Sequence, residues 1–385
     1  MKRISKIAFI TIHNPYNRIS RSGVPYSIYQ ELQKNYEVIW IKPDYDLVGA
    51  KLLYLLVSGF KRILHICGYN VLHLPILSYL LSKSAEKKLR KIEYDCIFTL
   101  GSIEIAYLNA DKPIFCRADA IVHSFPNYYV NNVPKFAKRW AYTVEERALH
   151  KLTLFFVASQ WVIDEISKYK IKEPLHKFVL IETGANLNIN EVQYVLHDYG
   201  VQKQLQILFV GYDIERKGIN EAFDAVRLLN EKYQIKSILV VMGGKPSDEL
   251  LSSGYVRYAG NKDKNNPQEY KEFYEEFAKA SLFLFPTKAE CHGIVNCEAA
   301  AYGLPIFSYN TGGVPSYCID GVNGRCLPVS ATGKDFAKVI YESIESGSIK
   351  RFSENSRKLF LECFNWETWG KKVNKYIDDC LQNLT

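Results

Sequence analysis

Several signals of common protein classes are missing from this chain of 385 residues. No Gly-x-Gly occurs, which excludes the dinucleotide fingerprint of dehydrogenases, and Gly243–Lys245 is followed by Pro246 instead of the Ser or Thr of a Walker A loop. The nine cysteines include no Cys-x-x-Cys pair, so we expect a reduced, cytoplasmic compartment and neither a zinc site nor a disulfide framework. The longest apolar runs, Leu52–Phe60 and Val71–Ser82, fall short of the ~20 residues of a membrane span.

The net charge of +8 is moderate, but part of it is clustered beside these apolar runs. Lys61 and Arg62 follow the first run directly, and five basic residues follow the second: Lys83, Lys87, Lys88, Arg90 and Lys91. Such a mixture suits an anionic membrane surface, although an amphipathic helix packed on its own domain explains it more simply. Peripheral contact with the inner face of the cell membrane therefore stays open. Nucleic acid is a poor fit, because no recognised binding motif appears.

Apolar runs rich in Ile, Val and Phe alternate with helical patterns along the whole chain, which is typical of parallel βαβ units. The strands predicted in the first half are Lys6–Ile12, Tyr36–Lys42, Tyr94–Leu100, Pro113–Arg117, Leu152–Ala158 and Phe178–Ile181. Those predicted in the second half are Leu205–Gly211, Ser237–Met242, Val256–Ala259, Leu282–Phe285 and Pro305–Tyr309. A polar stretch at about 185–204 lacks a buried strand and is the expected linker. The pattern predicts an α/β protein with two Rossmann-like domains that bind ligands at the carboxyl ends of their strands.

Two glutamates, Glu290 and Glu298, frame the most informative segment of the chain. The apolar run Ser281–Phe285 before them predicts a buried strand, and Gly293–Ala301 predicts a helix of small and apolar residues. Glu290 is then expected in the loop at the carboxyl end of the strand. Glu298 is expected about two turns into the helix.

The amino end of this helix is predicted to form an anion site. No acidic side chain accompanies the N–H groups of Gly293, Ile294 and Val295, so these donors can meet a phosphate. A phosphate bound there would lie between two carboxylates that accept hydrogen bonds from hydroxyls on either side of it. A nucleotide-sugar has this layout, because its pyrophosphate lies between a ribose and a hexose.

At this point the chain resembles glycosyltransferase family 4, retaining enzymes of the GT-B fold, through Glu-x7-Glu followed by Ala-x-x-x-Gly-x-Pro. Three further segments resemble the family in the expected order, namely Phe209–Gly218, Thr311–Pro315 and Asp320–Gly324. The resemblance implies two domains facing each other across a cleft. We expect an acceptor-binding domain at 1–190, a nucleotide-sugar-binding domain at 203–364, and a helix at 365–385 that crosses back to the first domain.

The resemblance also implies roles for individual residues. Glu290 would hold hydroxyls of the donor hexose, and Glu298 would hold the ribose. Arg216 and Lys217, which follow the strand ending at Gly211, would stabilise the negative charge that develops on the diphosphate leaving group. Their simpler explanation is a surface Arg-Lys pair at the start of an exposed helix.

Other candidates from the resemblance are less regular. Ser22-Gly23 resembles the family's glycine-containing loop over the donor phosphates, although many members have Gly-Gly there and Ser22 could be an ordinary helix N-cap. Asp119 occupies an area where relatives often contact the transferred sugar or the acceptor, and it completes the catalytic candidates. His123 nearby is more simply structural. His292 stands where many relatives have Phe, so it either contacts the donor or packs.

We therefore predict a retaining glycosyltransferase that moves a hexose from a nucleotide-diphosphate sugar, with UDP favoured on frequency, to a glycan or lipid-linked sugar. The expected context is bacterial cell-surface polysaccharide synthesis. The nucleotide-sugar is a substrate, and no cofactor or metal is expected, because Asp44–Asp46 matches the metal-binding Asp-x-Asp only superficially. Retaining relatives are thought to use front-face attack without a protein nucleophile. Tyr128 and Tyr129 are candidates for stacking on an acceptor sugar.

Alternatives from other classes stay open. A GT-B protein can bind a nucleotide-sugar without transferring it, as a scaffold or partner subunit. Epimerisation of a sugar nucleotide or phosphorolysis is a third possibility. A carboxylate pair can also serve a glycoside hydrolase, although two glutamates on one loop-helix unit suit the binding of one ligand along its length. The base, the sugar, the acceptor and the linkage are left undetermined.

Overall fold

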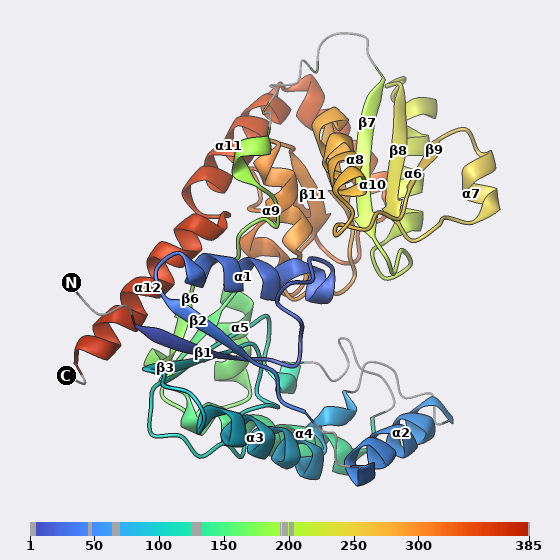
Figure 1. The fold of residues 1–385 in the computed structure, drawn as a ribbon. Helices are drawn as coiled ribbons and strands as arrows, with labels where there is room; N and C mark the ends of the chain where they lie inside the picture. Colours follow the sequence, from blue (N-terminus) through green and yellow to red (C-terminus); the bar gives the residue numbers. More distant parts are fainter. Residues whose placement is uncertain are drawn as a thin grey trace. The chain divides into compact units, whose positions relative to one another are not determined.

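The computed structural model describes residues 5–44, 48–63, 70–124, 133–192, 194, 199 and 204–383. The chain divides into two compact units (Figure 1). Unit 1 comprises Met1–Ile181 and Gly370–Thr385, and unit 2 comprises Glu182–Trp369. The last helix, α12 (Trp366–Gln382), therefore begins in unit 2 and continues in unit 1.

Unit 1 contains a six-stranded parallel sheet in the order β2-β1-β3-β4-β5-β6. Its strands are β1 (Lys6–Ile10), β2 (Glu37–Ile41), β3 (Cys96–Thr99), β4 (Ile114–Ala118), β5 (Leu154–Val157) and β6 (Phe178–Leu180). Its helices are η1 (Ser20–Gly23), α1 (Val24–Gln33), α2 (Val48–Ile63), η2 (Val71–His73), α3 (Pro75–Leu89), η3 (Val122–Ser124), α4 (Lys135–Lys151), α5 (Gln160–Lys168) and η4 (Leu175–Lys177).

Both faces of this sheet are buried, because successive side chains of a strand point to opposite faces. One face presents Ala8 and Ile10 of β1, and this face packs against α3, α4 and α5. The other face carries a row of phenylalanine rings, in which Phe9 stacks on Phe98 at 6.0 Å and Phe98 stacks on Phe156 at 6.2 Å. Helices α1 and α12 contact this aromatic row, for instance through Tyr29, whose ring meets that of Phe9 at 5.4 Å.

Unit 2 contains a second six-stranded parallel sheet, in the order β12-β11-β10-β7-β8-β9. Its strands are β7 (Leu205–Gly211), β8 (Ser237–Gly243), β9 (Val256–Gly260), β10 (Leu282–Phe285), β11 (Ile306–Tyr309) and β12 (Gly324–Leu327). Its helices are η5 (Ile189–Glu191), α6 (Ile219–Glu231), α7 (Asp248–Ser252), α8 (Pro267–Lys279), α9 (Ile294–Ala301), η6 (Val314–Ser316), α10 (Gly333–Glu345) and α11 (Ser348–Glu362).

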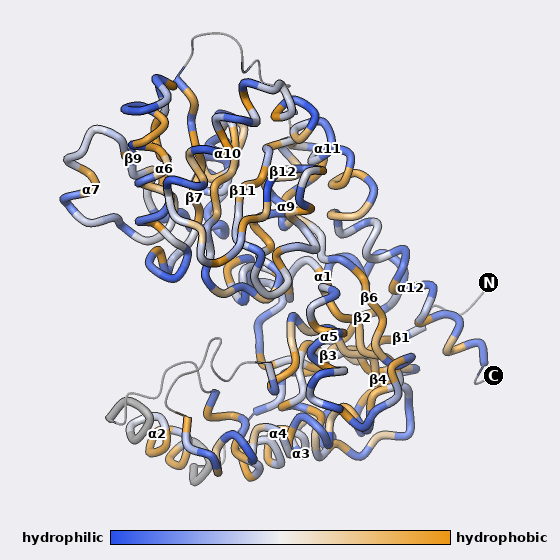
Figure 2. The backbone as a smooth tube through the Cα atoms, turned by 180° about the vertical axis from the view of Figure 1, so that it is seen from behind, coloured by the Kyte–Doolittle hydropathy of each residue, from blue (hydrophilic) through white to orange (hydrophobic). Residues whose placement is uncertain are grey.

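The two faces of this second sheet belong to two separate hydrophobic cores. Leu208 and Val210 of β7 lie in the core shared with α8, α9 and α11. Ile207 and Phe209 of the same strand lie in the core shared with α6 and α10. Figure 2 shows hydrophobic segments, in orange, among the labelled elements of this unit. Helices on both faces of a parallel sheet make unit 2 a Rossmann-like domain, as the sequence predicted.

Every strand predicted from the sequence is present, and the ends of the predicted strands differ by at most two residues from those in the structure. One edge strand, β12, was missed, because Gly324–Leu327 is short and contains an arginine where an apolar run was sought. Among the described residues, every helix is too short or too polar to cross a lipid bilayer.

The turn before β12 is held by the buried side chain of Asn323. Its Oδ1 accepts the backbone N–H of Ile319 at 2.7 Å, and its Nδ2 donates to the carbonyl of Tyr317 at 2.8 Å. At Gly324, an added Cβ would lie 1.7 Å from the carbonyl oxygen of Ile306, so only glycine fits there. The segment Asp320–Gly324 therefore has a structural reason for its composition: it places β12 against β11.

We predict that Asn323→Ala lowers the free energy of unfolding by about 2–6 kcal/mol, because a buried polar group left without its partner costs ~1–3 kcal/mol and two groups are affected. Asn355→Ala is the matched control: its Nδ2 donates to the carbonyl of Val322 in the same turn at 2.9 Å, but at an exposed position. That variant should lose less than ~1 kcal/mol. Urea denaturation of both variants tests the prediction, and equal losses would contradict it.

Candidate functional site

The strand order of unit 2 changes direction between β7 and β10. From β7 the chain proceeds through β8 to β9 on one side, and from β10 it proceeds through β11 to β12 on the other. Ligands of parallel α/β sheets bind outside the carboxyl ends of the strands at such a switch point. The loops after β7 and β10 hold Arg216, Lys217 and Glu290, so the sequence-predicted residues lie at this point.

These two loops are bonded to each other. The backbone N–H of Lys288 donates to the carbonyl of Arg216 at 2.9 Å. The Arg216 guanidinium donates in return to the carbonyl of Ala289, and its Nε donates to Asp213 at 3.1 Å. Arg216 is therefore held by contacts to both loops, and its role in stabilising a leaving group stays a prediction.

Lys217 and Glu290 form an ion pair across the two loops. Their side chains are only 12% and 15% exposed, and Arg216 Nη1 lies 3.9 Å from the same carboxylate. The Lys217 ammonium also lies 4.6 Å from the centroid of the Phe285 ring at the end of β10. Glu290 thus lies between two cations, of which Arg216 also pairs with Asp213.

Two glycines allow the loops to approach this closely. A Cβ added at Gly211 would lie 2.8 Å from Cγ of Lys217, so the bare backbone makes room for the lysine stem. Gly218 has φ of +83°, and its added Cβ would lie 2.1 Å from the carbonyl oxygen of Pro286. The sequence predicted Gly211 as a ligand contact. In the structure Gly211 lies against the side chain of Lys217, and its contact with a ligand stays a prediction.

Burial lowers the pKa of Lys217, with the neighbouring Arg216 cation acting in the same direction and Glu290 opposing both. A buried ammonium is costly because its charge is removed from water. An anionic ligand beside Lys217 would favour the charged form, so the electrostatics of this side chain suit a negatively charged partner.

Helix α9 begins directly beside this ion pair. Its N-cap is Gly293, with φ of +70°, and no acidic residue lies in its first turn. A Cβ at Gly293 would lie 3.1 Å from Cγ of Glu290, and the carbonyl of Glu290 accepts the backbone N–H of Gly313 at 3.1 Å. The loop of the Thr311–Pro315 segment therefore helps to hold Glu290 next to the N–H groups of Gly293, Ile294 and Val295.

His292 is buried and packs beside Tyr317, with ring centroids 5.8 Å apart and planes inclined at 56°. The packing explanation for this departure from the family pattern is therefore supported, while a contact between His292 and the donor stays a prediction.

Glu298 is fully buried on α9. Its Oε1 accepts a hydrogen bond from the Tyr274 hydroxyl at 3.0 Å and one from the Lys264 ammonium at 2.8 Å. Its Oε2 is buried without a hydrogen-bond partner among the described residues. The Lys264 ammonium also lies 4.1 Å from the centroid of the Phe273 ring. Lys264 and Tyr274 were not predicted from the sequence, because nothing in the residues between β9 and α8 signals a partner for Glu298.

In unit 1 the corresponding switch point lies between β1 and β3, and the loop after β1 contains Ser22 and Gly23. Three successive residues, Arg21, Ser22 and Gly23, have φ of 45°, 56° and 86°. Non-glycine residues in this left-handed region are uncommon, and they cluster at ligand sites. The Arg21 guanidinium donates to the carbonyl of Leu100 after β3 at 2.8 Å, which links the two loops of this switch point.

Asp119 follows β4 and lies between two arginines. It forms an ion pair with the buried Arg117 and lies 3.6 Å from Nη2 of Arg21. Its side chain is 26% exposed, so this predicted catalytic candidate is placed at the same edge of the sheet as Ser22 and Gly23. Its role in contacting sugar or acceptor stays a prediction.

Two further titratable side chains adjoin Arg21. Burial raises the pKa of Glu104, whose Oε1 accepts the backbone N–H of Ile12 at 3.3 Å. Burial and the Arg21 charge lower the pKa of His13 to about 4, so its imidazole is neutral at physiological pH. The cluster of His13, Arg21, Glu104 and Asp119 was not predicted, because its members come from the loops after β1, β3 and β4.

His123 has the structural role that its position suggested. Its Nδ1 lies 3.1 Å from Glu145, and its ring stacks on that of Tyr142 at 4.0 Å. Tyr128 and Tyr129 lie outside the described residues. Within the described ranges, no three His, Cys, Asp or Glu side chains are grouped closely enough to hold a metal ion.

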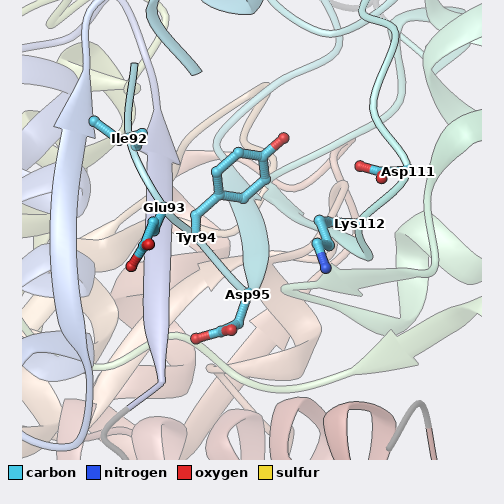
Figure 3. Close-up of a pocket in the computed structure, with 6 residues that line it drawn as sticks. All are labelled: Ile92, Glu93, Tyr94, Asp95, Asp111 and Lys112. Atoms are coloured by element: carbon cyan, nitrogen blue, oxygen red, sulfur yellow. The ribbon is translucent and has the colours of Figure 1, made fainter. Parts of the chain in front are cut away.

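A separate hollow of about 340 Å³ lies in unit 1 (Figure 3). Tyr94 and Asp95 precede β3, and Asp111 and Lys112 precede β4, so this hollow is at the amino-terminal edge of the sheet. Asp95 has a structural task there, since it accepts the backbone N–H of Lys6 at 2.7 Å. Because ligands of such sheets bind at the opposite edge, this hollow is not part of the candidate site.

Comparison with known proteins agrees with this geometry. The family described as "Glycosyl transferases group 1" matches residues 198–359. The match covers most of unit 2, and the solved structures to which the chain is similar show that it has the GT-B fold of glycosyltransferases. The α/β fold class predicted from the sequence is thereby confirmed, and the match to group 1 glycosyl transferases agrees with the predicted resemblance to glycosyltransferase family 4.

Two curated relatives come from bacteria. An uncharacterized 41.2 kDa protein in the cps region of Klebsiella pneumoniae is 25% identical over 263 residues, which cover 65% of this chain and 67% of that protein. The capsular polysaccharide biosynthesis glycosyltransferase CapM of Staphylococcus aureus is 22% identical over 251 residues, which cover 60% of this chain and 65% of CapM. The matches thus span about two thirds of each relative's length.

Among solved structures, the chain is similar to the Anabaena protein HepE in complex with UDP and glucose, with a TM-score of 0.65 and 15% sequence identity. The match covers 97% of this chain and all of HepE. At this identity the likeness shows the fold, and it extends over both units of the chain.

We predict that the Lys264–Glu298 pair is energetically coupled, because removing one partner leaves the other charge buried and uncompensated. A double-mutant cycle of Lys264→Met and Glu298→Gln, measured by urea denaturation, should give a coupling free energy of roughly 1–3 kcal/mol, below the ~3–5 kcal/mol cost of breaking a fully buried pair because Lys264 is partly exposed. Its control is Lys262–Glu272, a more exposed pair in the same region at 2.7 Å. That pair should give less than ~1 kcal/mol. Equal coupling in the two pairs would contradict the special role of Lys264.

Proposed function

We propose that this protein is a retaining glycosyltransferase that moves a hexose from a nucleotide-diphosphate sugar to a glycan or glycolipid acceptor. The observation that carries the proposal is the convergence of Arg216, Lys217 and Glu290 at the switch point of unit 2, beside the amino end of α9. A UDP-sugar is the favoured donor, which the HepE complex with UDP and glucose supports. CapM supports a role in bacterial cell-surface polysaccharide synthesis.

The chemistry requires stabilisation of the leaving group. Negative charge grows on the diphosphate as its bond to the anomeric carbon breaks, and Arg216 and Lys217 supply positive charge there. The N–H groups at the start of α9 supply further donors. Because both loops already hold these cations, little reorganisation is needed when the charge develops.

The two glutamates bind the donor on either side of the diphosphate. Glu290 accepts hydrogen bonds from hexose hydroxyls while it remains next to Lys217. The buried Oε2 of Glu298 accepts a ribose hydroxyl, and this supports the assignment because a buried acceptor without a partner costs ~1–3 kcal/mol. Asp119 contacts the transferred sugar or the acceptor. Front-face attack, with the leaving phosphate taking the acceptor proton, requires neither a protein nucleophile nor a metal ion.

We predict that one nucleoside diphosphate among UDP, GDP and ADP raises the melting temperature of the protein. Arg216→Ala should weaken the binding of both this nucleotide and free pyrophosphate. Glu298→Gln should weaken nucleotide binding by about 10–100-fold, since hydrogen bonds to charged groups contribute ~1.5–3 kcal/mol, but should leave pyrophosphate binding unchanged. Thermal-shift titration measures all four ligands.

Lys288→Ala is the control for this experiment, because Lys288 is half exposed and pairs with Glu221, away from Glu290. No shift with any nucleotide, in a well-folded protein, would oppose the transferase function, whereas nucleotide binding without turnover would favour a non-catalytic GT-B scaffold or partner subunit. Where a nucleotide binds, donor hydrolysis in the presence of EDTA tests metal independence, and NMR of the released anomer tests retention. Arg216→Ala or Lys217→Ala should then slow turnover by ~100-fold or more.

We predict an alkaline limb in the pH dependence of kcat/KM that reports Lys217. Its pKa is lowered, so it loses its proton at lower pH than an ordinary lysine, and activity should fall as pH rises through that value. Lys217→Arg should move this limb to higher pH, because a guanidinium stays charged. The limb in kcat should also lie higher, since a bound diphosphate favours the ammonium. Lys288→Arg serves as the control, and an unmoved limb in Lys217→Arg would assign it to another group.

A further inference from the structure

Three neighbouring helices of unit 1 expose large apolar side chains on their outer surface. On α2, Leu52, Leu55 and Leu56 are 56%, 57% and 53% exposed. Their spacing of three and four residues places them on one face of the helix. The opposite face of α2 packs inward through Leu53 and Val57. Helix α2 therefore presents apolar side chains both to its own domain and to the outside.

Helices α3 and α4 also carry large exposed apolar side chains. Ile76 and Tyr79 on α3 are 49% and 42% exposed, and Phe136 and Trp140 on α4 are 58% and 39% exposed. The Phe136 and Trp140 rings contact each other at 5.0 Å. Helix α3 contacts both α2 and α4, and the two views of the chain place all three helices side by side (Figures 1 and 2). We call these exposed side chains and their helices the apolar face.

Basic residues outnumber acidic ones in the segment that contains α2 and α3. Residues 48–92 contain eight Lys and Arg and a single acidic residue, Glu86, in a chain whose net charge is +8. Glu86 is buried and paired with Lys83 and Arg90, so it contributes no free negative charge. On α4, the exposed Lys135 and Arg139 flank Phe136 and Trp140.

We propose that the apolar face docks on an anionic lipid bilayer, with the leucine and aromatic side chains inserted at the interface and the basic side chains among the headgroups. Leu, Phe and Trp with flanking Lys and Arg are the residues that lie in such an interface. Patches of this kind on a soluble domain mark an interaction surface. No described helix is able to span a bilayer, so the contact is peripheral.

Charge decides between this occupant and a second copy of the chain. Two copies meeting through the apolar face would bring two strongly positive surfaces together, which is unfavourable. An anionic bilayer gains from the same charge, at ~1 kcal/mol for each Lys or Arg near its surface. The proposal is independent of the donor site in unit 2, and it rests on the proposed function only for its purpose, access to a lipid-linked acceptor.

The test is flotation of the full chain with vesicles of phosphatidylcholine alone or mixed with phosphatidylglycerol. We expect binding to the anionic vesicles, weakened by salt, and little binding to the neutral ones. Phe136→Ser with Trp140→Ser, and separately Leu52→Ser with Leu55→Ser, should each weaken anionic binding by about tenfold or more, since each residue inserted at the interface buries apolar area. The charge variant, Lys87→Glu with Lys135→Glu and Arg139→Glu, should abolish it.

Leu175→Ser is the matched control, because Leu175 is 57% exposed in unit 1 but lies on η4, outside the apolar face. No binding, equal binding to both vesicles, or wild-type binding by the variants would overturn the proposal. So would a stable dimer in solution that the Phe136→Ser/Trp140→Ser variant dissociates. Nucleotide thermal shifts measured without vesicles separate the two proposals, since either can fail while the other holds.

Discussion

The ion pair between Lys217 and Glu290 is the interaction on which the candidate site depends. It joins the loops after β7 and β10, the two strands at which the sheet order of unit 2 changes direction. The backbone bond from Lys288 to Arg216 and the Arg216 guanidinium bond to Ala289 close the same junction. Without these contacts, two cations next to the start of a helix would repel each other and the helix dipole. The carboxylate of Glu290 makes their placement stable.

The packing around the site allows these loops to approach each other closely. Gly218 approaches the carbonyl of Pro286 more closely than any side chain would permit, and Gly211 leaves room for the stem of Lys217. Behind them, the Thr311–Pro315 segment holds Glu290 through the N–H of Gly313. The small residues of α9 let that helix pack in the core while Glu298 remains fully buried. The composition of these motifs is therefore explained by steric limits as well as by ligand contacts.

Much of the fold follows from the sequence because parallel strands buried on both faces are continuous apolar runs. This is why β7 and β10 were located at their observed bounds, and why β12, with Gly324 and Arg325, was missed. Glu290 and Lys217 were found through motifs, although 73 residues separate them. The partners of Glu298 were not, because Lys264 and Tyr274 belong to no pattern and meet it only after α8 packs on the sheet.

The positive charge of the chain is used in two physically different ways. At the candidate site Lys217 is nearly buried and paired, so its charge acts at short range and is screened little by salt. On the apolar face the basic side chains are spread over α3 and α4 and the residues that flank them, where water and salt weaken each one. A single such charge contributes little, but several acting on one anionic surface add up, provided that apolar side chains hold the helices at that surface. The presence of exposed apolar and basic side chains together on α3 and α4 therefore carries more weight than either the hydrophobic pattern or the net charge of +8 alone.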